Sequence, residues 1–206
     1  MLVYLLRHLP TEYNRSGRYM GRSNDLPILD ESVSKYRDAL AKMGLIDNIS
    51  RLKIICSSSL RCKQTANLLS ELLSNTDVII NHDLDEVDYG DFEGKFPQDI
   101  KKLYPAEYRR WMERPSTLKF PGGESFVEVQ QRAVKLVLEQ IELRDGDNIF
   151  LVSHVDVIKM VICWVMDIPI DNKRMFRIDN GSVSCLETSN ELYNQKKLRV
   201  RYLNGI

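Results

Sequence analysis

An α/β fold, with a mostly parallel sheet between layers of helices, is the architecture that this sequence predicts. Short apolar runs with strand character alternate with longer helix-like segments over most of the chain, which is typical of such folds. Two of the strongest runs, 2–6 and 149–152, lead into the pair Arg7-His8 and into His154. Ligands of open α/β sheets bind at the carboxyl ends of parallel strands, so these histidines mark a candidate site.

Size and charge restrict the class of protein. The 206 residues are long enough for one domain over residues 1–206, and no Pro/Gly/Ser-rich linker divides them. Lys plus Arg and Asp plus Glu number 29 each, so no global field indicates a nucleic acid or an anionic membrane as partner. No segment reaches the roughly 18 apolar residues of a membrane span, and the opening run lacks a basic leader. We therefore expect a cytoplasmic protein, a monomer or a homodimer, with no nucleic-acid or membrane partner.

The first strand, 2–6, is followed by a polar stretch from 9 to 29. This stretch is too long for a simple connector, and loops of such length are usually functional or disordered. Asp30 is expected to cap a helix over 31–43 that ends at Gly44.

The next segments repeat the alternation of strand and helix. Residues 52–56 form the second expected strand, and a helix over 60–73 places its leucines mostly on one apolar stripe. A short third strand at 78–80 precedes the turn-rich segment 88–94.

The second half of the chain contains the expected insertion and closes the sheet. Residues 95–123 mix short helical stretches with prolines, which indicates a small cap-like insertion. A long helix is predicted at 126–143, before the second histidine-bearing strand, and another at 157–166. Two final strands, at 183–186 and 198–202, complete a three-layer α/β/α arrangement.

The cysteines do not suggest a metal or disulfide framework. None of the four stands in a paired spacing; they are Cys56, Cys62, Cys163 and Cys185. Cys56 and Cys185 lie in strand-like runs and are expected to be small core residues.

Charged residues at element boundaries suggest phosphoryl chemistry. Arg61 opens a helix directly after the second strand, so its guanidinium would face the same edge of the sheet as the histidines. Nearby arginines lower the pKa of a histidine, which keeps the ring neutral and nucleophilic. His8 could therefore attack phosphorus while Arg7 and Arg61 neutralise the phosphoryl oxygens. The leaving group needs an acid, and Glu86 is the best candidate, although in isolation it would be read as an exposed strand-edge residue.

Six motifs follow one another in register across nearly the whole chain. They are Arg7-His8-x-x-Thr11-x-x-Asn14, Tyr19-Met20-Gly21-Arg22, Ser57-Ser58-x-Leu60-Arg61-x-x-Gln64-Thr65-Ala66, Leu84-x-Glu86-x-x-x-Gly90-Asp91-Phe92-Glu93-Gly94, Pro121-Gly122-Gly123-Glu124-Ser125 and Val152-Ser153-His154. Each is weak alone, but the set resembles the histidine phosphatase superfamily, the phosphoglycerate mutase-like family. The short chain and the segment 176–180 are most similar to its small phosphatase branch, particularly to α-ribazole phosphatase-like members.

The resemblance implies a metal-independent phosphomonoester hydrolase that acts on a small phosphorylated metabolite without a metal or organic cofactor. His8 would form a phosphohistidine, and Glu86 would act as general acid and base. The residues that the resemblance implies in phosphate binding are Arg7, Asn14, Arg61 and His154. Gly21 stands where family members approach the substrate with their backbone, whereas His82 matches no family site and is expected at the surface.

Two positions depart from the family pattern. Leu9 replaces the glycine that follows the nucleophile, and Val155-Asp156 replace the two glycines after the second histidine. If the backbone at residue 9 requires a positive φ, a leucine there would strain or shift the floor of the pocket. Asp156 would bring a carboxylate near an anion site. We expect these departures to alter substrate choice or rate.

Two other functions remain open. A phosphoglycerate mutase-type phosphoryl transferase would return the phosphoryl group to a substrate hydroxyl, and Arg109, Arg110 and Arg114 could bind its second anionic group. The favoured interpretation of these arginines is that they are exposed and paired with neighbouring glutamates. A non-catalytic phospholigand-binding protein would keep the phosphate-binding arginines but show no turnover.

Overall fold

A six-stranded sheet lies at the centre of the computed structural model, which describes residues 1–23, 25–42, 52–73, 76–143, 148–193 and 196–205. The strands, in the spatial order β3-β2-β4-β1-β5-β6, are β1 (Leu2–Arg7), β2 (Leu52–Cys56), β3 (Val78–Ile80), β4 (Asn148–Ser153), β5 (Val183–Tyr193) and β6 (Lys196–Tyr202). The first four strands of that order are parallel, whereas β5 is antiparallel to β1 and β6 to β5. The predicted, mostly parallel sheet is therefore confirmed.

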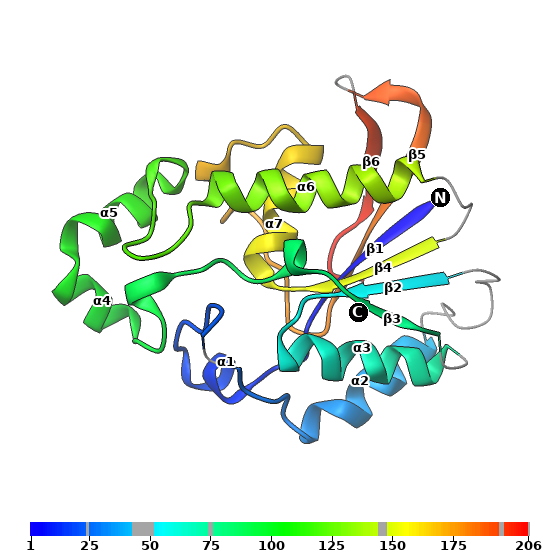
Figure 1. Ribbon diagram of the computed structural model, residues 1–206, viewed down its shortest axis with the longest axis horizontal. Helices are drawn as coiled ribbons and strands as arrows, with labels where there is room; N and C mark the ends of the chain where they lie inside the picture. The colour runs from blue at the N-terminus through cyan, green and yellow to red at the C-terminus, as the bar shows by residue number, and fades with distance from the viewer. Residues whose placement is uncertain (24, 43–51, 74–75, 144–147, 194–195, 206) are drawn as a thin grey trace.

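Helices cover both faces of this sheet, as Figure 1 shows. The α-helices are α1 (Glu12–Ser16), α2 (Glu31–Lys42), α3 (Leu60–Leu72), α4 (Pro97–Leu103), α5 (Pro105–Glu113), α6 (Phe126–Glu142) and α7 (Val155–Val165). Single 3-10 turns add η1 (His82–Leu84), η2 (Gly90–Phe92), η3 (Pro115–Thr117) and η4 (Ile170–Asn172). Helices α2 and α3 lie on one face and α6 and α7 on the other, which confirms the three-layer α/β/α arrangement.

The alternation of side chains along β1 explains why the sheet is buried on both sides. Val3 and Leu5 belong to the core formed with α6 and α7, whereas Tyr4 and Leu6 belong to the core formed with α2 and α3. A strand that is buried on both faces is apolar at every position, so it appears in the sequence as an uninterrupted apolar run.

Several element boundaries differ from the sequence-based predictions. The polar stretch after β1 contains the short helix α1, in which the side chain of Asn14 accepts hydrogen bonds from the backbone N–H and the hydroxyl of Thr11. Helix α7 begins at Val155 instead of residue 157, because His154 itself takes the extended N-cap conformation. The predicted strand 183–186 is much longer, since it continues as β5 in pairing with β6. Gly44, the predicted end of α2, lies outside the described residues.

The segment that was predicted as a cap-like insertion contains α4, α5 and η3, and it lies beyond the sheet at the left of Figure 1. Trp111 of α5 is 2% exposed and joins this segment to the rest of the protein. Its indole packs at ring-centroid distances of 4.5 to 5.7 Å against Tyr19, Tyr89, Phe92 and Phe120. Because Tyr19 and Tyr89 also line the cavity described below, this aromatic cluster fixes part of the wall of the site.

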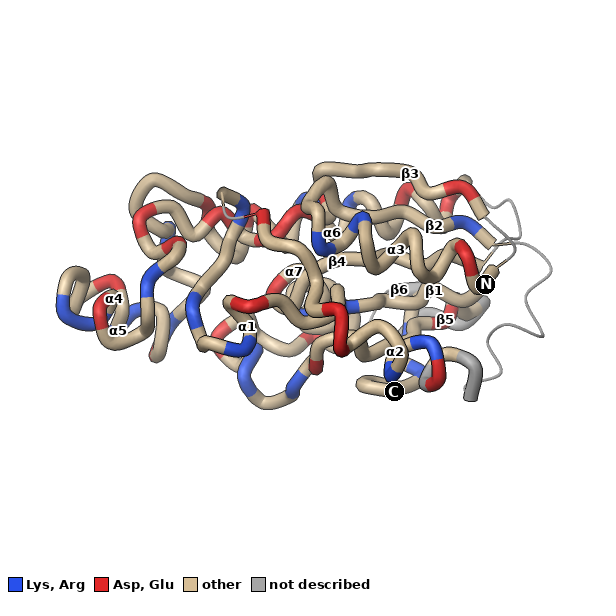
Figure 2. The backbone as a smooth tube through the Cα atoms, turned by 90° about the horizontal axis from the view of Figure 1, so that it is seen from below, with Lys and Arg blue, Asp and Glu red and all other residues tan. Residues whose placement is uncertain are grey.

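Charges of both signs are interspersed along the backbone, as Figure 2 shows. Within the described part of the chain, no helix is long and apolar enough to cross a membrane. The four cysteines are free and buried, so the expected core positions of Cys56 and Cys185 are confirmed. The same described residues contain no group of His, Cys, Asp and Glu that could hold a metal ion.

Candidate active site

The two predicted strand-end histidines meet because β1 and β4 are neighbours in the sheet. The strands run parallel with Arg7 opposite Ser153, so both chains leave the sheet at the same edge. The backbone N–H of His8 donates to the carbonyl of Ser153 at 2.9 Å. The imidazole rings of His8 and His154 consequently lie 5.1 Å apart, and both residues are buried.

The ring of His8 is held in one tautomer. Its Nδ1 lies 2.6 Å from the carbonyl oxygen of Leu9. A carbonyl oxygen can only accept a hydrogen bond, so Nδ1 carries the proton and Nε2 keeps its lone pair. Burial first, and then the charges of Arg61 and Arg7, hold the pKa of His8 well below its ordinary value. His8 is therefore a neutral imidazole with a free nucleophilic nitrogen.

Leu9 fits its position without backbone strain. Among the described residues, those with a positive φ do not include Leu9, so the condition for a strained pocket floor is not met. Its backbone N–H donates to the hydroxyl of Thr65 at 3.0 Å, and its side chain is buried. The neighbouring Gly181 has φ +75°, and a Cβ there would lie 3.0 Å from Leu9 Cδ2. A glycine at position 181 thus makes room for the leucine.

Arg61 and His154 form a hydrogen-bonded pair at the start of α3. One terminal nitrogen of Arg61 donates to the carbonyl of Gly21 at 2.9 Å and lies 3.2 Å from Nδ1 of His154. Because a guanidinium only donates, this Nδ1 is the acceptor, and Nε2 of His154 donates to the hydroxyl of Ser57 at 2.9 Å. Both ring nitrogens of His154 are thus engaged within the protein, and His154 orients the guanidinium of Arg61.

Arg7 and Asn14 present further donors. A terminal nitrogen of Arg7 donates to the carbonyl of Ile178 at 2.7 Å, while its buried Nε has no hydrogen-bond partner among the described residues. The Oδ1 atom of Asn14 accepts from Thr11 at 3.0 Å and from the amide of Asn180 at 3.3 Å. These contacts orient the side chain of Asn14 so that its NH2 group is the part left to donate.

Glu86 is a buried carboxyl group with a perturbed acidity. It is 6% exposed, and its Oε1 accepts from the backbone N–H of Val87 at 3.0 Å. Burial, reinforced by the negative charge of Asp156, raises the pKa of Glu86 to about 7. A carboxyl group with that pKa can donate a proton and later accept one near neutral pH.

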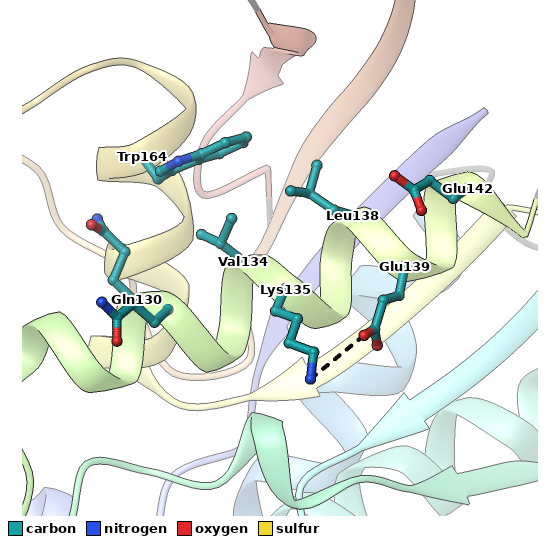
Figure 3. Close-up of a pocket in the computed structure, with 8 residues that line it drawn as sticks. Gln130, Val134, Lys135, Leu138, Glu139, Glu142 and Trp164 are labelled. Atoms are coloured by element: carbon teal, nitrogen blue, oxygen red, sulfur yellow. Dashed lines mark ion pairs between the residues drawn. The ribbon is translucent and has the colours of Figure 1, made fainter.

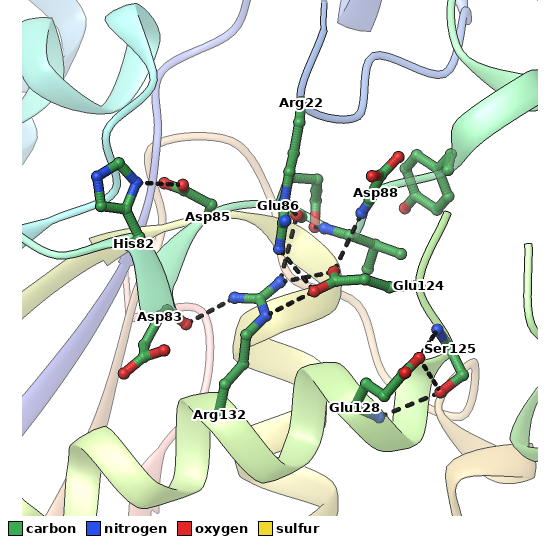
Figure 4. A network of polar contacts seen from close by, with 12 residues as sticks. Arg22, His82, Asp83, Asp85, Glu86, Asp88, Glu124, Ser125, Glu128 and Arg132 are labelled. Atoms are coloured by element: carbon green, nitrogen blue, oxygen red, sulfur yellow. Dashed lines mark hydrogen bonds and ion pairs between the residues drawn. The ribbon is translucent and has the colours of Figure 1, made fainter. Parts of the chain in front are cut away.

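The backbone of Glu86 is clamped by two arginines, as Figure 4 shows. Its carbonyl accepts from Nε of Arg22 at 2.8 Å and from a terminal nitrogen of Arg132 at 3.2 Å. Glu124, from the Pro-Gly-Gly-Glu-Ser motif, pairs with both guanidiniums, at 2.8 Å and 3.2 Å respectively. Sequence reasoning missed this clamp, because Arg132 is one of several polar residues on α6 and no local pattern indicates its partners.

One cavity of about 270 Å³ unites most of the predicted site residues. Those that line it are Arg7, His8, Asn14, Gly21, Arg61 and Glu86. His154 does not line the cavity but contacts Arg61, which does. His82, expected at the surface, is confirmed there, with a side chain 83% exposed beside Asp85.

Asp156 also lines this cavity, but its charge is not isolated. The ammonium of Lys173 lies 2.5 Å from Oδ1, and the hydroxyl of Tyr89 donates to Oδ2 at 2.5 Å. Although burial acts in the opposite direction, the positive charge of Lys173 holds the pKa of Asp156 below its ordinary value. The expected carboxylate near the anion site is therefore present and ionised. Sequence reasoning missed both partners of Asp156. Lys173 directly follows η4, 17 residues after Asp156, and Tyr89 precedes η2.

Two other hollows lack comparable chemistry. A larger one, about 550 Å³, lies along α6 and α7 and includes Leu138 and Trp164 but no histidine, cysteine or arginine (Figure 3). Arg109 lines a separate hollow on the helices α4 and α5. Arg110 is exposed and pairs with Glu107 at 3.7 Å, as the favoured interpretation predicted. None of the three arginines proposed for a second anion lines the cavity of His8.

Comparison with known proteins supports the same kind of chemistry. Residues 3–200 match the model of the histidine phosphatase superfamily (branch 1). The chain is 31% identical over 187 residues to phosphoserine phosphatase 1 of Hydrogenobacter thermophilus, covering 89% of this chain and 85% of the relative. It is 26% identical over 206 residues to the adenosylcobalamin/alpha-ribazole phosphatase of Escherichia coli, covering 100% and 96%.

Solved structures agree with these relatives. The alpha-ribazole phosphatase from Shigella flexneri superposes with a TM-score of 0.83 at 26% identity, covering 99% of this chain and 96% of that one. The family model spans nearly the whole chain, and its named relatives include several phosphatases. This chain is therefore a phosphatase, and it belongs to the histidine phosphatase superfamily, branch 1.

Proposed function

We propose that this protein hydrolyses a small phosphorylated metabolite through a phosphohistidine intermediate on His8, without a metal or organic cofactor. One observation carries the proposal. A neutral, tautomerically fixed histidine opens into the same cavity as two arginines and a carboxyl group whose pKa is about 7. These are the nucleophile, the anion-binding groups and the proton carrier that transfer of a phosphoryl group requires.

In the first step, Nε2 of His8 attacks phosphorus, and the ester P–O bond breaks. The carboxyl group of Glu86 gives its proton to the departing oxygen, which leaves as an alcohol. Arg7 and Arg61 are placed to neutralise the phosphoryl oxygens as negative charge shifts during transfer. Because the nucleophile is neutral before attack, no deprotonation has to precede this step.

In the second step, the Glu86 carboxylate accepts a proton from water, and the resulting hydroxide attacks phosphorus. The P–N bond breaks, inorganic phosphate departs, and both His8 and Glu86 return to their starting protonation states. One group thus serves as acid and then as base, which a pKa near 7 favours in both directions.

The remaining predicted residues have supporting roles in this proposal. Asn14 donates from its NH2 group to a phosphoryl oxygen, and Gly21 lets the backbone approach the substrate. Gly21 has φ +60°, a backbone conformation that residues with a Cβ rarely adopt, so a glycine is favoured there. His154 would contact a phosphoryl oxygen only by exchanging a present partner, so we assign its contribution mainly to the orientation of Arg61.

The direct test is phosphate release from a panel of phosphomonoesters in excess chelator by wild type, His8→Ala and His82→Ala. The last variant is a matched control, because its histidine is exposed and lies outside the cavity. We expect release by wild type and His82→Ala and none by His8→Ala. Chelator-sensitive activity, or release by clean His8→Ala protein, would contradict the proposal.

The panel includes 3-phosphoglycerate, with the reaction also assayed for 2-phosphoglycerate. Isomerisation without phosphate release would identify a mutase, and binding of phosphoesters with neither reaction would identify a binding protein. Both outcomes would replace the proposed hydrolysis.

A further inference from the structure

We propose that Tyr89 and Asp156 form a leaving-group subsite that accepts a hydrogen bond from a hydroxyl of the substrate. The inference rests on the proposed phosphatase function and narrows its substrate class. We expect the preferred substrates to be alkyl phosphates whose alcohol carries a second hydroxyl close to the ester, as in polyol or sugar phosphates.

The subsite consists of two buried polar side chains that line the cavity, and a third buried side chain, Lys173, contacts one of them. Tyr89, Asp156 and Lys173 are 4%, 6% and 4% exposed. Tyr89 and Asp156 line the same cavity as the nucleophile His8 and the proton carrier Glu86. A leaving group bound beside Glu86 therefore lies within the cavity that these two side chains help to enclose.

The direction of the hydrogen bond between Tyr89 and Asp156 follows from the charges. Lys173, 2.5 Å from Oδ1, keeps Asp156 ionised, so this carboxylate can only accept. Burial, and then the negative charges of Asp156 and Glu86, raise the pKa of Tyr89 well above its ordinary value, so the phenol keeps its proton. Tyr89 therefore donates its only proton to Oδ2 of Asp156, at 2.5 Å.

A phenol oxygen that has committed its proton in this way offers only lone pairs to a third group. Asp156 likewise offers only lone pairs. This part of the wall thus accepts hydrogen bonds but donates none. A hydroxyl on the leaving group satisfies it, whereas a methyl group leaves the buried oxygens without the partner that water would otherwise supply.

The charge at the same position disfavours anionic leaving groups. Asp156 would repel a carboxylate or second phosphate placed against it, because the ammonium of Lys173 is already held between Asp156 and the ring of Phe126, 3.7 Å from the ring centroid. Three arginines line the cavity: Arg7 and Arg61 are assigned to the phosphoryl group, whereas Arg18 is exposed and stacks over Phe96 at 4.4 Å. A neutral hydroxyl is the group that this wall fits best.

The experiment compares two esters of equal size. 2-Hydroxyethyl phosphate and n-propyl phosphate have the same number of non-hydrogen atoms and differ by a hydroxyl in place of a methyl group. The ratio of their kcat/KM values is measured for wild type, Tyr89→Phe and Tyr104→Phe. The control removes a phenolic hydroxyl that also donates to a carboxylate, Asp91 at 3.2 Å, but lies outside the cavity lining.

We expect wild type to prefer 2-hydroxyethyl phosphate by about tenfold or more, after correction for the uncatalysed rates of the two esters. Tyr89→Phe should lower the ratio about tenfold, because it keeps the ring and the Asp156–Lys173 pair but removes one acceptor. Tyr104→Phe should keep the wild-type ratio. The intrinsic reactivity of each ester cancels in these comparisons between variants.

An equal loss on both esters in Tyr89→Phe, or an unchanged ratio, would overturn the subsite. If Tyr89→Phe fails to fold, the test rests on the wild-type ratio of the two kcat/KM values, corrected for the uncatalysed rates. A wild type without preference for 2-hydroxyethyl phosphate would then overturn the inference. Hydrolysis of p-nitrophenyl phosphate separates the two proposals. If p-nitrophenyl phosphate is hydrolysed but the hydroxyl ester is not preferred, only the proposed subsite is contradicted. If no ester is hydrolysed, the proposed hydrolysis is contradicted as well.

Discussion

The location of one proton on His8 determines what the candidate site can do. The carbonyl of Leu9 holds that proton on Nδ1, and Arg7 and Arg61 disfavour a second one on Nε2. Two strand-end motifs predicted that histidines and arginines would meet. The tautomer could not be predicted, because it depends on the backbone direction of Leu9, at a position where the family glycine is replaced.

The neutral state of His8 is a measurable property. We expect its ring resonances to show no titration midpoint near the ordinary value of 6.5, since burial and the two arginines lower its pKa well below that value. An NMR titration of ring-labelled protein, with His8→Ala for assignment, checks this. A His8 midpoint near its ordinary value would contradict the buried, cation-flanked environment.

Glu86→Gln tests the proton carrier through the leaving group. We expect kcat/KM to fall by about 100-fold or more for alkyl phosphates, whose alkoxides need a proton, and much less for p-nitrophenyl phosphate. This parameter reports the steps up to formation of the phosphohistidine, so it isolates the acid role. Equal losses on both types of ester would exclude Glu86 as the general acid.

The same substitution has a consequence for stability. The folded-state pKa of Glu86 is raised from 4.5 to about 7, so between these values the unfolded state releases its proton first. The contribution of Glu86 to the free energy of unfolding is therefore fully present below pH 4.5. It declines by up to about 3 kcal/mol as the pH rises to 7. Glu86→Gln lacks this loss. We expect its melting temperature, relative to wild type, to be higher at pH 8 than at pH 5, and a pH-independent difference would contradict the raised pKa.

At the scale of elements, the strands could be predicted from the sequence, whereas the polar contacts at the ends of the helices and around the site could not. Strand β1 is apolar at every position because it is buried on both faces, which makes it visible in the sequence. The start of α7 was misplaced because His154 serves as its N-cap, a role that other residue types usually fill. Lys173 escaped notice because it meets Asp156 only through tertiary packing.

Helix α6 contributes to the site through Arg132, which reaches the backbone carbonyls of Asp83 and Glu86 at 2.6 Å and 3.2 Å. We expect Arg132→Met to lower kcat/KM for alkyl phosphates about tenfold by loosening Glu86, with a smaller effect on p-nitrophenyl phosphate. The matched control is Lys135→Met on the same helix, where an exposed pair with Glu139 is lost. A loss that is the same for both types of ester would show that Arg132 does not act through Glu86.

At the scale of the whole molecule, six short motifs spread over the sequence predict the fold better than any of them predicts a role. Several of these motifs follow parallel strands, so we expected their catalytic candidates at one edge of the sheet. The structure confirms that β2, β4 and β1 are adjacent and parallel. We propose that residues 1–206 form one domain and that residues 95–123 act as a cap-like insertion. Trp111 supports this proposal, because it packs the insertion against Tyr19 and Tyr89 of the cavity wall.

The measurement that tests the central proposal most directly is the covalent intermediate itself. Wild type and His8→Ala are mixed with a 32P-labelled phosphomonoester, quenched in base within a single turnover, and digested for peptide analysis. We expect label on the wild-type peptide that contains His8, stable in base and lost in acid, and none on His8→Ala. Substrate consumption by wild type without such label, or label on another residue, would contradict it.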